Sequence, residues 1–356
     1  MKRALALAER GRGRTRPNPI VGAVVVRGAR VVGEGWHTAA GQPHAEAVAL
    51  RRAGRGARGA TLYVTLEPCA HTGRTPPCVD AIAAAGIRRC VVAIRDPHVI
   101  VNGRGLRRLR ERGVRVEVGV CAQEARAALE GYRLAHLEGR PRVTWKLGAT
   151  LDGRVADAEG RSRWITSRAS REHAQRARAQ SDAIVIGAGT ARADDPRLTA
   201  RGARVRMQPL RVVCDTRLSL PLSLRLFGAL ARGTVVACAR EASAARSRAL
   251  ERRGVKVWRL PRSGVGISTR ALARRLAAAG CHDVLLESGP ALGAAWLRSG
   301  LIDEWLVYVA PRVLGGEALG WPGALGPLAL PSAIEGRVIE ARRLGRDALL
   351  RVEVRR

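Results

Sequence analysis

The sequence is poor in aromatic side chains, in lysine and in long apolar runs. It holds one Phe and three Tyr, and only three of its 63 basic residues are Lys, so almost all of its positive charge is Arg. No apolar run reaches the ~18 residues that a membrane-spanning helix needs. The N-terminal stretch 1–16 also lacks the sustained apolar core of a secretory signal. We therefore expect neither a membrane partner nor an export signal.

Cysteine is scarce, odd in number and widely scattered. The seven cysteines are Cys69, Cys78, Cys90, Cys121, Cys214, Cys238 and Cys281. This distribution argues against a disulfide framework and predicts a cytoplasmic, reducing location. A length of 356 residues with 46% hydrophobic content is enough for about two globular domains.

Acidic residues are half as frequent as basic ones, which gives a formal net charge of +33 and invites a nucleic-acid interpretation. The excess is not clustered, however. Residues 1–140 carry 25 basic and 11 acidic side chains, and residues 141–356 carry 38 and 19. We interpret the charge as a compositional bias that scatters Arg over the surface, and we expect no specific nucleic-acid partner.

Against this background one combination stands out, the stretch PHAEAVAL at 43–50 together with LEPCAHTGRTPPC at 66–78. It supplies the imidazole of His44, the carboxylate of Glu46 and the thiols of Cys69 and Cys78. Structural zinc sites use four protein ligands, whereas catalytic sites use three and keep one position open for water. The pattern His-x-Glu followed by Pro-Cys and a second Cys is the signature of zinc deaminases of nucleobases. It predicts one catalytic Zn²⁺ held by the imidazole and both thiolates, with Glu46 as the acid–base group.

The alternative is that these residues are accidental core cysteines, because a lone buried Cys is usually a small apolar residue. The local context favours the metal. Cys69 ends an apolar strand pattern at 60–66, while His44 and Cys78 each follow a proline and open a helical pattern. Two helix N-termini would then face the metal, which suits thiolates electrostatically.

The order of elements predicts an α/β domain over residues 1–140. A helix is expected at 2–11, a hairpin at 20–27 and 30–36, and further strands at 60–66, 88–94 and 114–120. Helical patterns begin at His44, Cys78 and residue 106, and one long helical segment covers 122–138. This alternation is typical of a three-layer α/β/α domain.

A second α/β domain is predicted over residues 141–356, after the polar Gly- and Pro-containing boundary at 137–154. Strands are expected at 182–190, 211–215, 234–239, 255–260 and 282–288, and helices at 241–253, 269–279 and 290–298. The strand at 304–313 and two C-terminal segments alternate as antiparallel strands do. The strand at 182–190 is expected to run into a Gly-containing turn, and the segment GAGTAR (187–192) lacks the third glycine of a Rossmann fingerprint. ESGPALGAAWL (287–297) could cradle phosphate on backbone N–H groups, although helix-capping glycines explain it equally well.

Taken together, ordered motifs along nearly the whole chain resemble the bifunctional deaminase/reductase family of bacterial riboflavin biosynthesis. The first domain carries RPNPIVGAVVV, GEGWH, GQPHAEAVAL and YVTLEPCAHTGRTPPC; the second carries KLGATLDGR, SRWITS, RAQSDAI, ADDPRLT, LESGPALGAAWL and DEWLVYVAPRVLGG. The long spacing between the thiols is unlike that of tRNA adenosine deaminases. The sequence departs from the family at His98-Val99, in the loop 96–105.

The resemblance implies a cytidine-deaminase-like domain followed by a dihydrofolate-reductase-like domain that uses NADPH. It implies hydrolytic deamination of 2,5-diamino-6-(5-phosphoribosylamino)pyrimidin-4-one. The second reaction is reduction of the ribosyl group of 5-amino-6-(5-phosphoribosylamino)uracil to ribityl. By the same resemblance we expect a homo-oligomer, either a dimer or a tetramer.

The resemblance also implies site residues. In the deaminase, substrate contacts fall on Asn18, His71 and Arg74, although an Asx turn explains Asn18 equally well and a solvated side chain competes for Arg74. In the reductase, substrate positions are Ser162, Arg178, Leu198, Arg201 and Glu287, with Lys146 as a catalytic group beside the substrate. Cofactor positions are Gly148, Trp164, Thr190, Asp194, Thr216, Gly289, Pro290, Ala291, Leu292, Gly293, Ala294 and Ala295.

Two other functions compete with the bifunctional enzyme. A nucleic-acid-acting zinc deaminase with an accessory domain is favoured by the net charge, but the motifs of the second domain argue against it. A noncatalytic basic protein with structural zinc is the other alternative. Glu46 argues against it, because a structural site has no use for an unligated carboxylate beside the metal.

Overall fold

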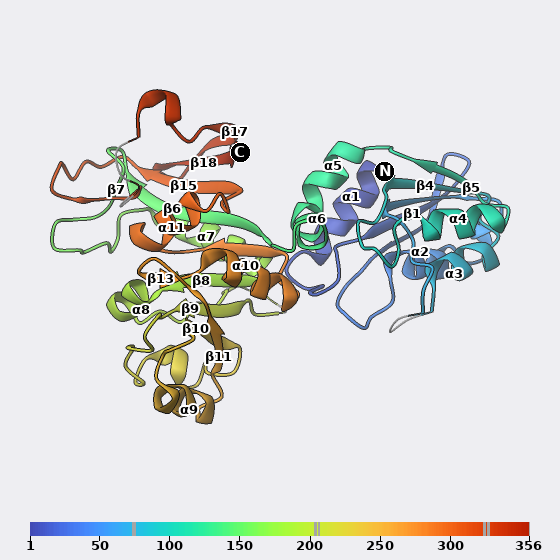
Figure 1. The fold of residues 1–356 in the computed structure, drawn as a ribbon. Helices are drawn as coiled ribbons and strands as arrows, with labels where there is room; N and C mark the ends of the chain where they lie inside the picture. Colours follow the sequence, from blue (N-terminus) through green and yellow to red (C-terminus); the bar gives the residue numbers. More distant parts are fainter. Residues whose placement is uncertain (73–75, 203–204, 206, 323–324, 326–327, 356) are drawn as a thin grey trace. The chain divides into compact units, whose positions relative to one another are not determined.

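The computed structural model describes residues 1–72, 76–202, 205, 207–322, 325 and 328–355. The chain divides into two compact units, Met1–Arg140 (unit 1) and Pro141–Arg356 (unit 2). Each unit is built around its own sheet (Figure 1). In the described part of the chain, no helix combines the length and the apolar character needed to cross a membrane.

Unit 1 contains a five-stranded sheet with the strand order β2-β1-β3-β4-β5. Its strands are β1 (Gly22–Arg27), β2 (Arg30–Trp36), β3 (Thr61–Leu66), β4 (Arg89–Ile94) and β5 (Arg115–Val118). Strand β1 is antiparallel to both β2 and β3, whereas β3, β4 and β5 are mutually parallel. The parallel half places the end of β3, which leads to Cys69, beside the end of β4.

Helices cover both faces of this sheet. They are α1 (Lys2–Ala8), α2 (Ala45–Ala53), α3 (Cys78–Ala84), α4 (Arg104–Glu111), α5 (Ala122–Ala128) and α6 (Glu130–Leu137). Side chains alternate along a strand, so Ala23 and Val25 pack with α2, α3 and α4, while Val24 packs against α1 on the opposite face. Helices α5 and α6 cover the end of β4 on the α1 side. The predicted three-layer α/β/α arrangement is observed.

Unit 2 contains a nine-stranded sheet with the order β11-β10-β9-β8-β14-β6-β15-β18-β17. Its strands are β6 (Arg142–Thr150), β8 (Ala183–Gly187), β9 (Leu210–Cys214), β10 (Thr234–Ala239), β11 (Lys256–Leu260), β14 (Asp283–Leu286), β15 (Glu304–Ala310), β17 (Gly336–Leu344) and β18 (Asp347–Val354). Short pairs outside this sheet are β7 (Arg154–Ala156) with β16 (Leu319–Gly320), and β12 (Arg262–Ser263) with β13 (Gly266–Ile267). From β11 to β15 the neighbours are parallel, whereas β18 is antiparallel to both of its neighbours, β15 and β17.

The helices of unit 2 are α7 (Arg168–Gln180), α8 (Ala188–Asp194), α9 (Ala244–Arg252), α10 (Thr269–Ala278) and α11 (Pro290–Arg298). Helices α10 and α11 pack on one face of the sheet through residues such as Leu276 and Trp296. Helices α8 and α9 pack on the other face, and Ala174 and Ala177 of α7 pack against β15 and β18. The parallel strands therefore all end at one edge, where ligands bind in open α/β sheets.

Three details differ from the sequence expectations. A strand was predicted over 182–190, but β8 ends at Gly187, which is the N-cap of α8, and α8 begins at Ala188. The helical segment 122–138 is two helices that meet at Leu129. Helix α7 was not predicted, since RASREHAQRARAQ is polar, with one fully buried residue, Ser170, and lacks an apolar stripe.

Candidate functional site

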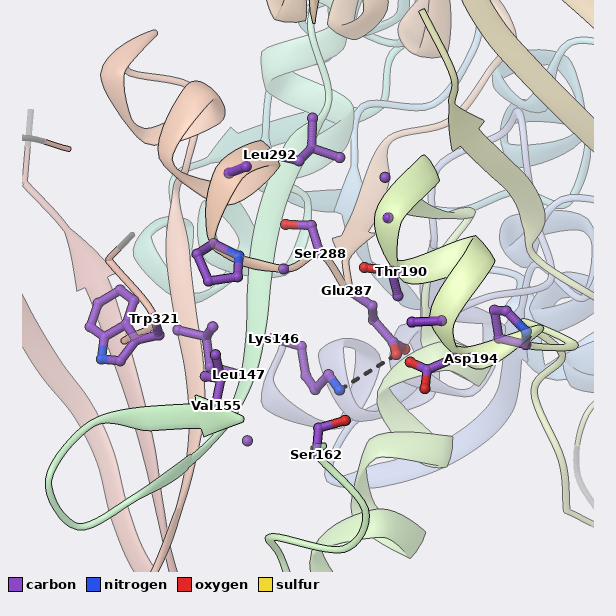
Figure 2. Close-up of a pocket in the computed structure, with 18 of the residues that line it drawn as sticks. Lys146, Leu147, Val155, Ser162, Thr190, Asp194, Glu287, Ser288, Leu292 and Trp321 are labelled. Atoms are coloured by element: carbon purple, nitrogen blue, oxygen red, sulfur yellow. Dashed lines mark ion pairs between the residues drawn. The ribbon is translucent and has the colours of Figure 1, made fainter. Parts of the chain in front are cut away.

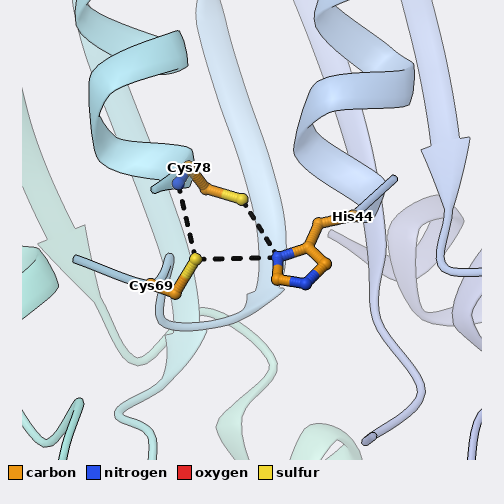
Figure 3. Close-up of side chains that lie close together, drawn as sticks. All are labelled: His44, Cys69 and Cys78. Atoms are coloured by element: carbon orange, nitrogen blue, oxygen red, sulfur yellow. Dashed lines mark hydrogen bonds between the residues drawn. The ribbon is translucent and has the colours of Figure 1, made fainter. Parts of the chain in front are cut away.

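Three metal-binding side chains converge in unit 1. His44 is the N-cap of α2, Cys78 is the first residue of α3, and Cys69 lies in the segment that leaves β3. The imidazole Nδ1 of His44 is 3.2 Å from the Sγ of Cys78 and 3.6 Å from the Sγ of Cys69 (Figure 3). All three potential ligand atoms lie within 4.8 Å of one another, and this is the one such group found in the described residues.

The spacing of these atoms fits zinc. Zn–S and Zn–N bonds of about 2.3 and 2.0 Å in a tetrahedron place neighbouring ligand atoms roughly 3.5–4 Å apart. The two N–S separations, 3.2 and 3.6 Å, lie just below and within this range, so binding requires only a small adjustment. One imidazole and two thiols form a three-ligand set, which leaves the fourth position for water or substrate.

The hydrogen bonds of the two thiols favour binding of a cation. The backbone N–H of Cys78 donates to the Sγ of Cys69 at 3.4 Å. Hydrogen bonds from the Cys78 thiol and from His44 lower the pKa of Cys69 to about 4, and the hydrogen bond to this thiolate raises the pKa of His44. Sharing one proton with Cys69 raises the pKa of Cys78 instead. A bound cation releases that proton, because metals bind the thiolate form.

Glu46 lies in the first turn of α2 and is 3% exposed. Burial and the nearby Cys69 thiolate raise its pKa to about 7, and its carboxylate interacts with the side chain of Cys78. A carboxyl group with a pKa near neutrality can both accept and release a proton, which suits general acid–base work.

Of the substrate residues expected in unit 1, Asn18 lies beside His37, with Nδ2 of the amide 3.0 Å from Nε2 of the imidazole. The ring of His37 stands edge-on to that of His44 at 5.4 Å between centroids. His71 is exposed and lies near His98, whose pKa is lowered by burial and then by His71. Arg74 lies outside the described residues. Sequence reasoning gave His37 no role, although it sits in the motif GEGWH.

A cavity of about 2320 Å³ opens at the carboxyl ends of the parallel strands of unit 2. The residues that line it come from β6, α8, the β12–β13 hairpin, the start of α11 and the segment around Trp321. Figure 2 shows Lys146, Glu287, Ser162 and Asp194 facing a common space.

A buried ion-pair network forms one wall of this cavity. The Nε and a terminal N–H of Arg178 donate to the two carboxylate oxygens of Glu287 at 2.5 and 2.7 Å, and the Nζ of Lys146 lies 3.5 Å from Oε2 (Figure 2). Burial alone would raise the pKa of Glu287. The charges of Lys146 and Arg178 outweigh it and bring that pKa to about 2. Glu287 is therefore a fixed anion that holds two cations at the cavity.

The start of α11 fits a phosphate-bearing cofactor. Pro290 occupies the first turn and Gly289 is the N-cap, which faces Thr190 of α8. A Cβ added at Gly289 would lie 3.7 Å from the Oγ1 of Thr190, so this cleft is narrow. The buried Oγ of Ser288 has no hydrogen-bond partner in the described structure and lines the cavity. An unpaired hydroxyl and free N–H groups at a helix start are suited to binding phosphate.

Trp164 is 61% exposed at the rim of the cavity. The guanidinium carbon of Arg171 lies 4.4 Å from its ring centroid, and Arg163 pairs with Asp194 at 3.0 Å. A flat aromatic face bordered by cations is a suitable surface for a planar ring of a cofactor.

Most of the expected reductase residues line this cavity. They are Lys146, Gly148, Ser162, Trp164, Arg178, Thr190, Asp194, Arg201, Thr216, Glu287, Gly289, Pro290, Ala291, Leu292 and Ala295. Leu198, Gly293 and Ala294 do not line it. The side chain of Leu198 belongs to the core beneath α8, and Gly293 packs directly against Trp145. The β12–β13 hairpin, which also lines the cavity, carried no signal in the sequence.

Comparisons with known proteins agree with both sites. A family model described as the RibD C-terminal domain matches residues 141–350, and one described as the cytidine and deoxycytidylate deaminase zinc-binding region matches residues 1–94. Riboflavin biosynthesis protein RibD of Aquifex aeolicus is 40% identical over 98% of this chain and 96% of its own length. RibD of Escherichia coli (strain K12) is 41% identical over 98% and 97%.

Solved structures extend the likeness to three dimensions. Acinetobacter baumannii RibD, form 1, superposes with a TM-score of 0.91 at 38% identity and covers 100% of this chain and 98% of its own. A structure from Thermotoga maritima is described as a diaminohydroxyphosphoribosylaminopyrimidine deaminase/5-amino-6-(5-phosphoribosylamino)uracil reductase. It gives a TM-score of 0.86 at 33% identity, covering 100% and 97%. These likenesses confirm the predicted fold class, a cytidine-deaminase-like domain followed by a dihydrofolate-reductase-like domain.

Two family models match in tandem, and relatives match over nearly their whole length. Each unit also has a site of its own, a three-residue metal-ligand cluster in unit 1 and a large cavity in unit 2, and all of these observations agree on one family. The chain belongs to the RibD family and is a bifunctional deaminase and reductase of riboflavin biosynthesis that uses zinc and NADPH.

Proposed function

We propose that residues 1–140 deaminate 2,5-diamino-6-(5-phosphoribosylamino)pyrimidin-4-one and that residues 141–356 reduce the ribosyl group of 5-amino-6-(5-phosphoribosylamino)uracil to ribityl. The observation that carries this proposal is the presence of two different chemical centres, one in each unit. Unit 1 has a three-ligand metal cluster with a buried carboxyl group beside it. Unit 2 has a cavity with a buried cation–anion network.

In the deaminase, His44, Cys69 and Cys78 would hold the zinc ion. When bound, zinc supplies a Lewis acid that activates water for attack on the pyrimidine ring. Glu46 takes one proton from the attacking water and delivers it to a ring nitrogen, and it then takes the remaining proton of the added hydroxyl and delivers it to the departing amine. Its position in the first turn of α2 and its pKa of about 7 support this double role.

Substrate binding in the deaminase would use Asn18, His71 and Arg74. The side-chain amide of Asn18, held beside His37, is suited to hydrogen bonding with the edge of the pyrimidine ring. An imidazole and a guanidinium are suited to the 5′-phosphate. A hydrogen-bonded amide also has a fixed orientation, which favours one ring edge over another.

In the reductase, Lys146 would be the catalytic cation. Its ammonium group would polarise the sugar carbonyl or imine at the carbon that is reduced, while Arg178 and Glu287 hold it in place. Ser162, Arg201 and the backbone at Leu198 would complete the substrate site. NADPH, when bound, supplies the hydride.

The cofactor would lie along the start of α11, with Gly289, Pro290, Ala291, Leu292 and Ala295 forming its phosphate-binding segment, while Gly293 and Ala294 are buried behind them and Gly293 packs on Trp145. Gly148, Trp164, Thr190, Asp194 and Thr216 would make the remaining contacts. Ser288 joins this set because its unpaired hydroxyl lines the cavity. The abundance of Arg at the cavity suits a 2′-phosphate and hence NADPH over NADH.

We also infer that the enzyme is cytoplasmic and a homo-oligomer. The scattered free cysteines support a reducing compartment. The edge strand β17 supports association, because Val338 and Ile339 are exposed on it. Light scattering of the purified chain measures its oligomeric state, and a monomer at micromolar concentration would contradict the oligomer.

The direct test is to incubate the purified chain with the diaminopyrimidine phosphoribosyl substrate, with and without NADPH, and to identify products by mass spectrometry. We expect the deaminated ribosyl product without NADPH and the deaminated ribityl product with it. Failure to lose the ring amine under either condition would overturn the deaminase proposal. Loss of the amine without reduction would overturn the reductase proposal alone.

A further inference from the structure

Glu67 is a buried carboxylate that neither proposed reaction uses. It follows β3 directly and is 4% exposed. Its Oε2 accepts hydrogen bonds from the backbone N–H groups of Asp96 and Gly103 at 3.2 and 2.9 Å. Its Oε1 accepts from those of Gly105 and Leu106 at 2.9 and 3.2 Å. One side chain thus satisfies four backbone donors on a different part of the chain.

These four donors lie on both sides of the segment 97–102, so Glu67 closes the base of a loop. They also include the start of α4. The N-cap of this helix is Gly103, which has φ +86° and offers no side chain to cap the first turn. Gly105 and Leu106 are in that first turn and would otherwise carry unsatisfied N–H groups. Glu67 therefore caps α4 from outside the helix, and its negative charge lies at the positive end of the helix dipole.

The same helix also packs against the segment that carries the metal ligand Cys69. A Cβ added at Gly105 would lie 2.0 Å from the carbonyl oxygen of Pro68, so the first turn of α4 packs directly on that peptide. Further along α4, a terminal N–H of Arg108 donates to the carbonyl oxygen of Ala70 at 2.9 Å. Helix α4 therefore contacts residues 67, 68 and 70, which lie on both sides of Cys69 in the sequence.

The loop held by Glu67 carries His98, which lies near His71, one of the proposed substrate residues of the deaminase. The ring of His98 also packs against that of His136 of α6, with centroids 4.4 Å apart. The loop is therefore fixed at its base by Glu67 and supported laterally by α6.

We propose that Glu67 is a positioning residue for deamination. Its hydrogen bonds couple the position of the loop 97–102 and of α4 to the position of the zinc ligand Cys69. This inference rests on the proposed deaminase function of unit 1. A carboxylate is required because all four contacts are donors. In Glu67→Gln, the amide NH₂ replaces one acceptor oxygen and faces two N–H groups.

The test compares Glu67→Gln with Glu117→Gln, a matched control that removes a carboxylate paired with Arg89 at the surface of the same unit. Four quantities are measured on each protein: zinc content, deaminase kcat/KM, reductase activity and amide hydrogen exchange. For Glu67→Gln we expect one zinc per chain and reductase activity within about twofold of wild type. Deaminase kcat/KM should fall by about tenfold or more, the scale for a misplaced reacting group. Exchange should accelerate in peptides covering 96–106 and stay unchanged in β3 and β4.

Two results would overturn the proposal. The first is deaminase kcat/KM within twofold of wild type although exchange of 96–106 has accelerated. The second is exchange accelerated equally throughout unit 1, which would make Glu67 a general stabilising residue. If Glu67→Gln does not fold in unit 1, Glu67→Asp keeps the carboxylate but shortens the side chain by one methylene group, so it weakens the same hydrogen bonds and is expected to give the same local pattern. A wild-type chain that does not deaminate, or a Cys69→Ser variant that does, would instead contradict the proposed function.

Discussion

His44, Cys69 and Cys78 come from one short stretch of sequence and their ligand atoms lie within 4.8 Å of one another. The cavity of unit 2, in contrast, draws its lining from residues between Lys146 and Trp321 and encloses about 2320 Å³. The first site is assembled by two helix N-termini and the end of one strand. The second is assembled by the ends of several parallel strands, which bring distant segments together only after the sheet has formed.

The pKa of a buried carboxyl group is also shifted in opposite directions at the two sites. Burial raises the pKa of Glu46 to about 7, so this group can exchange a proton near neutral pH. Lys146 and Arg178 bring the pKa of Glu287 to about 2, so this group stays charged. The difference indicates that Glu46 is suited to moving protons, whereas Glu287 is suited to holding cations in place.

The largest expected effect is the loss of metal and of deamination in unit 1 alone. In the double variant Cys69→Ser, Cys78→Ser, two of three ligands are removed, so we expect no stoichiometric zinc and no measurable deamination. Reduction of the deaminated intermediate should continue at the wild-type rate. Metal analysis together with both activity assays checks this, and stoichiometric zinc in the double variant would show that the ligands lie elsewhere.

The next effect separates chemistry from metal binding within the same site. Glu46→Gln keeps the size and hydrogen bonds of the side chain but cannot move a proton. Zinc should stay bound, while deaminase turnover falls by ~10²-fold or more, the usual scale for general acid–base catalysis. Turnover equal to wild type would mean that another residue is the base.

A smaller, complementary effect is expected in unit 2. Glu287→Gln removes the anion that holds Lys146 and Arg178, so both cations lose their orientation at the cavity. Reductase kcat/KM should fall by roughly 10- to 100-fold, which is the cost of misplacing reacting groups. Deamination should be unchanged. Equal losses in both activities would contradict the separation of the two sites.

The smallest effect concerns acid stability. The folded-state pKa of Glu287 is about 2, below its ordinary 4.5. Its contribution is therefore fully present above about pH 4.5 and is lost as the pH falls towards 2, on the order of 3 kcal/mol over the whole window. Six of the seven Trp lie in unit 2, so tryptophan fluorescence reports its unfolding. The stability difference between wild type and Glu287→Gln should narrow between pH 5 and pH 3.5. A constant difference would mean that Glu287 does not titrate in this window.

The two sites also differ in how far the sequence predicts them. His44, Glu46, Cys69 and Cys78 follow from spacing, because the helix starts and the strand end that place them are local patterns. Most strands of both sheets are equally local and lie near their predicted bounds, but no bounds were predicted for β6, because it falls in the segment 137–154 that was interpreted as a domain boundary. Arg178 and Glu287 were named only through the family resemblance, since nothing local indicates that α7 would bring its guanidinium to the end of β14.

Other features depended on contacts that no local pattern contains. Helix α7 lacks an apolar stripe because it packs through small residues such as Ala174 and Ala177. Glu67 stands two residues before Cys69 in the motif, yet its role depends on backbone donors 29 to 39 residues away that carry no side-chain signal. The β12–β13 hairpin is too short to show alternation.

Chelation of the zinc ion distinguishes a chain with two chemically independent sites from one whose sites are coupled. Zinc is removed from the intact enzyme, the already deaminated intermediate is supplied, and NADPH oxidation is followed by its absorbance. We predict that reduction continues at the rate of the untreated enzyme while deamination of the diaminopyrimidine substrate is abolished and returns when zinc is restored. If reduction disappears with the zinc although the tryptophan fluorescence of unit 2 remains that of the folded protein, the two sites are not independent and the account is wrong.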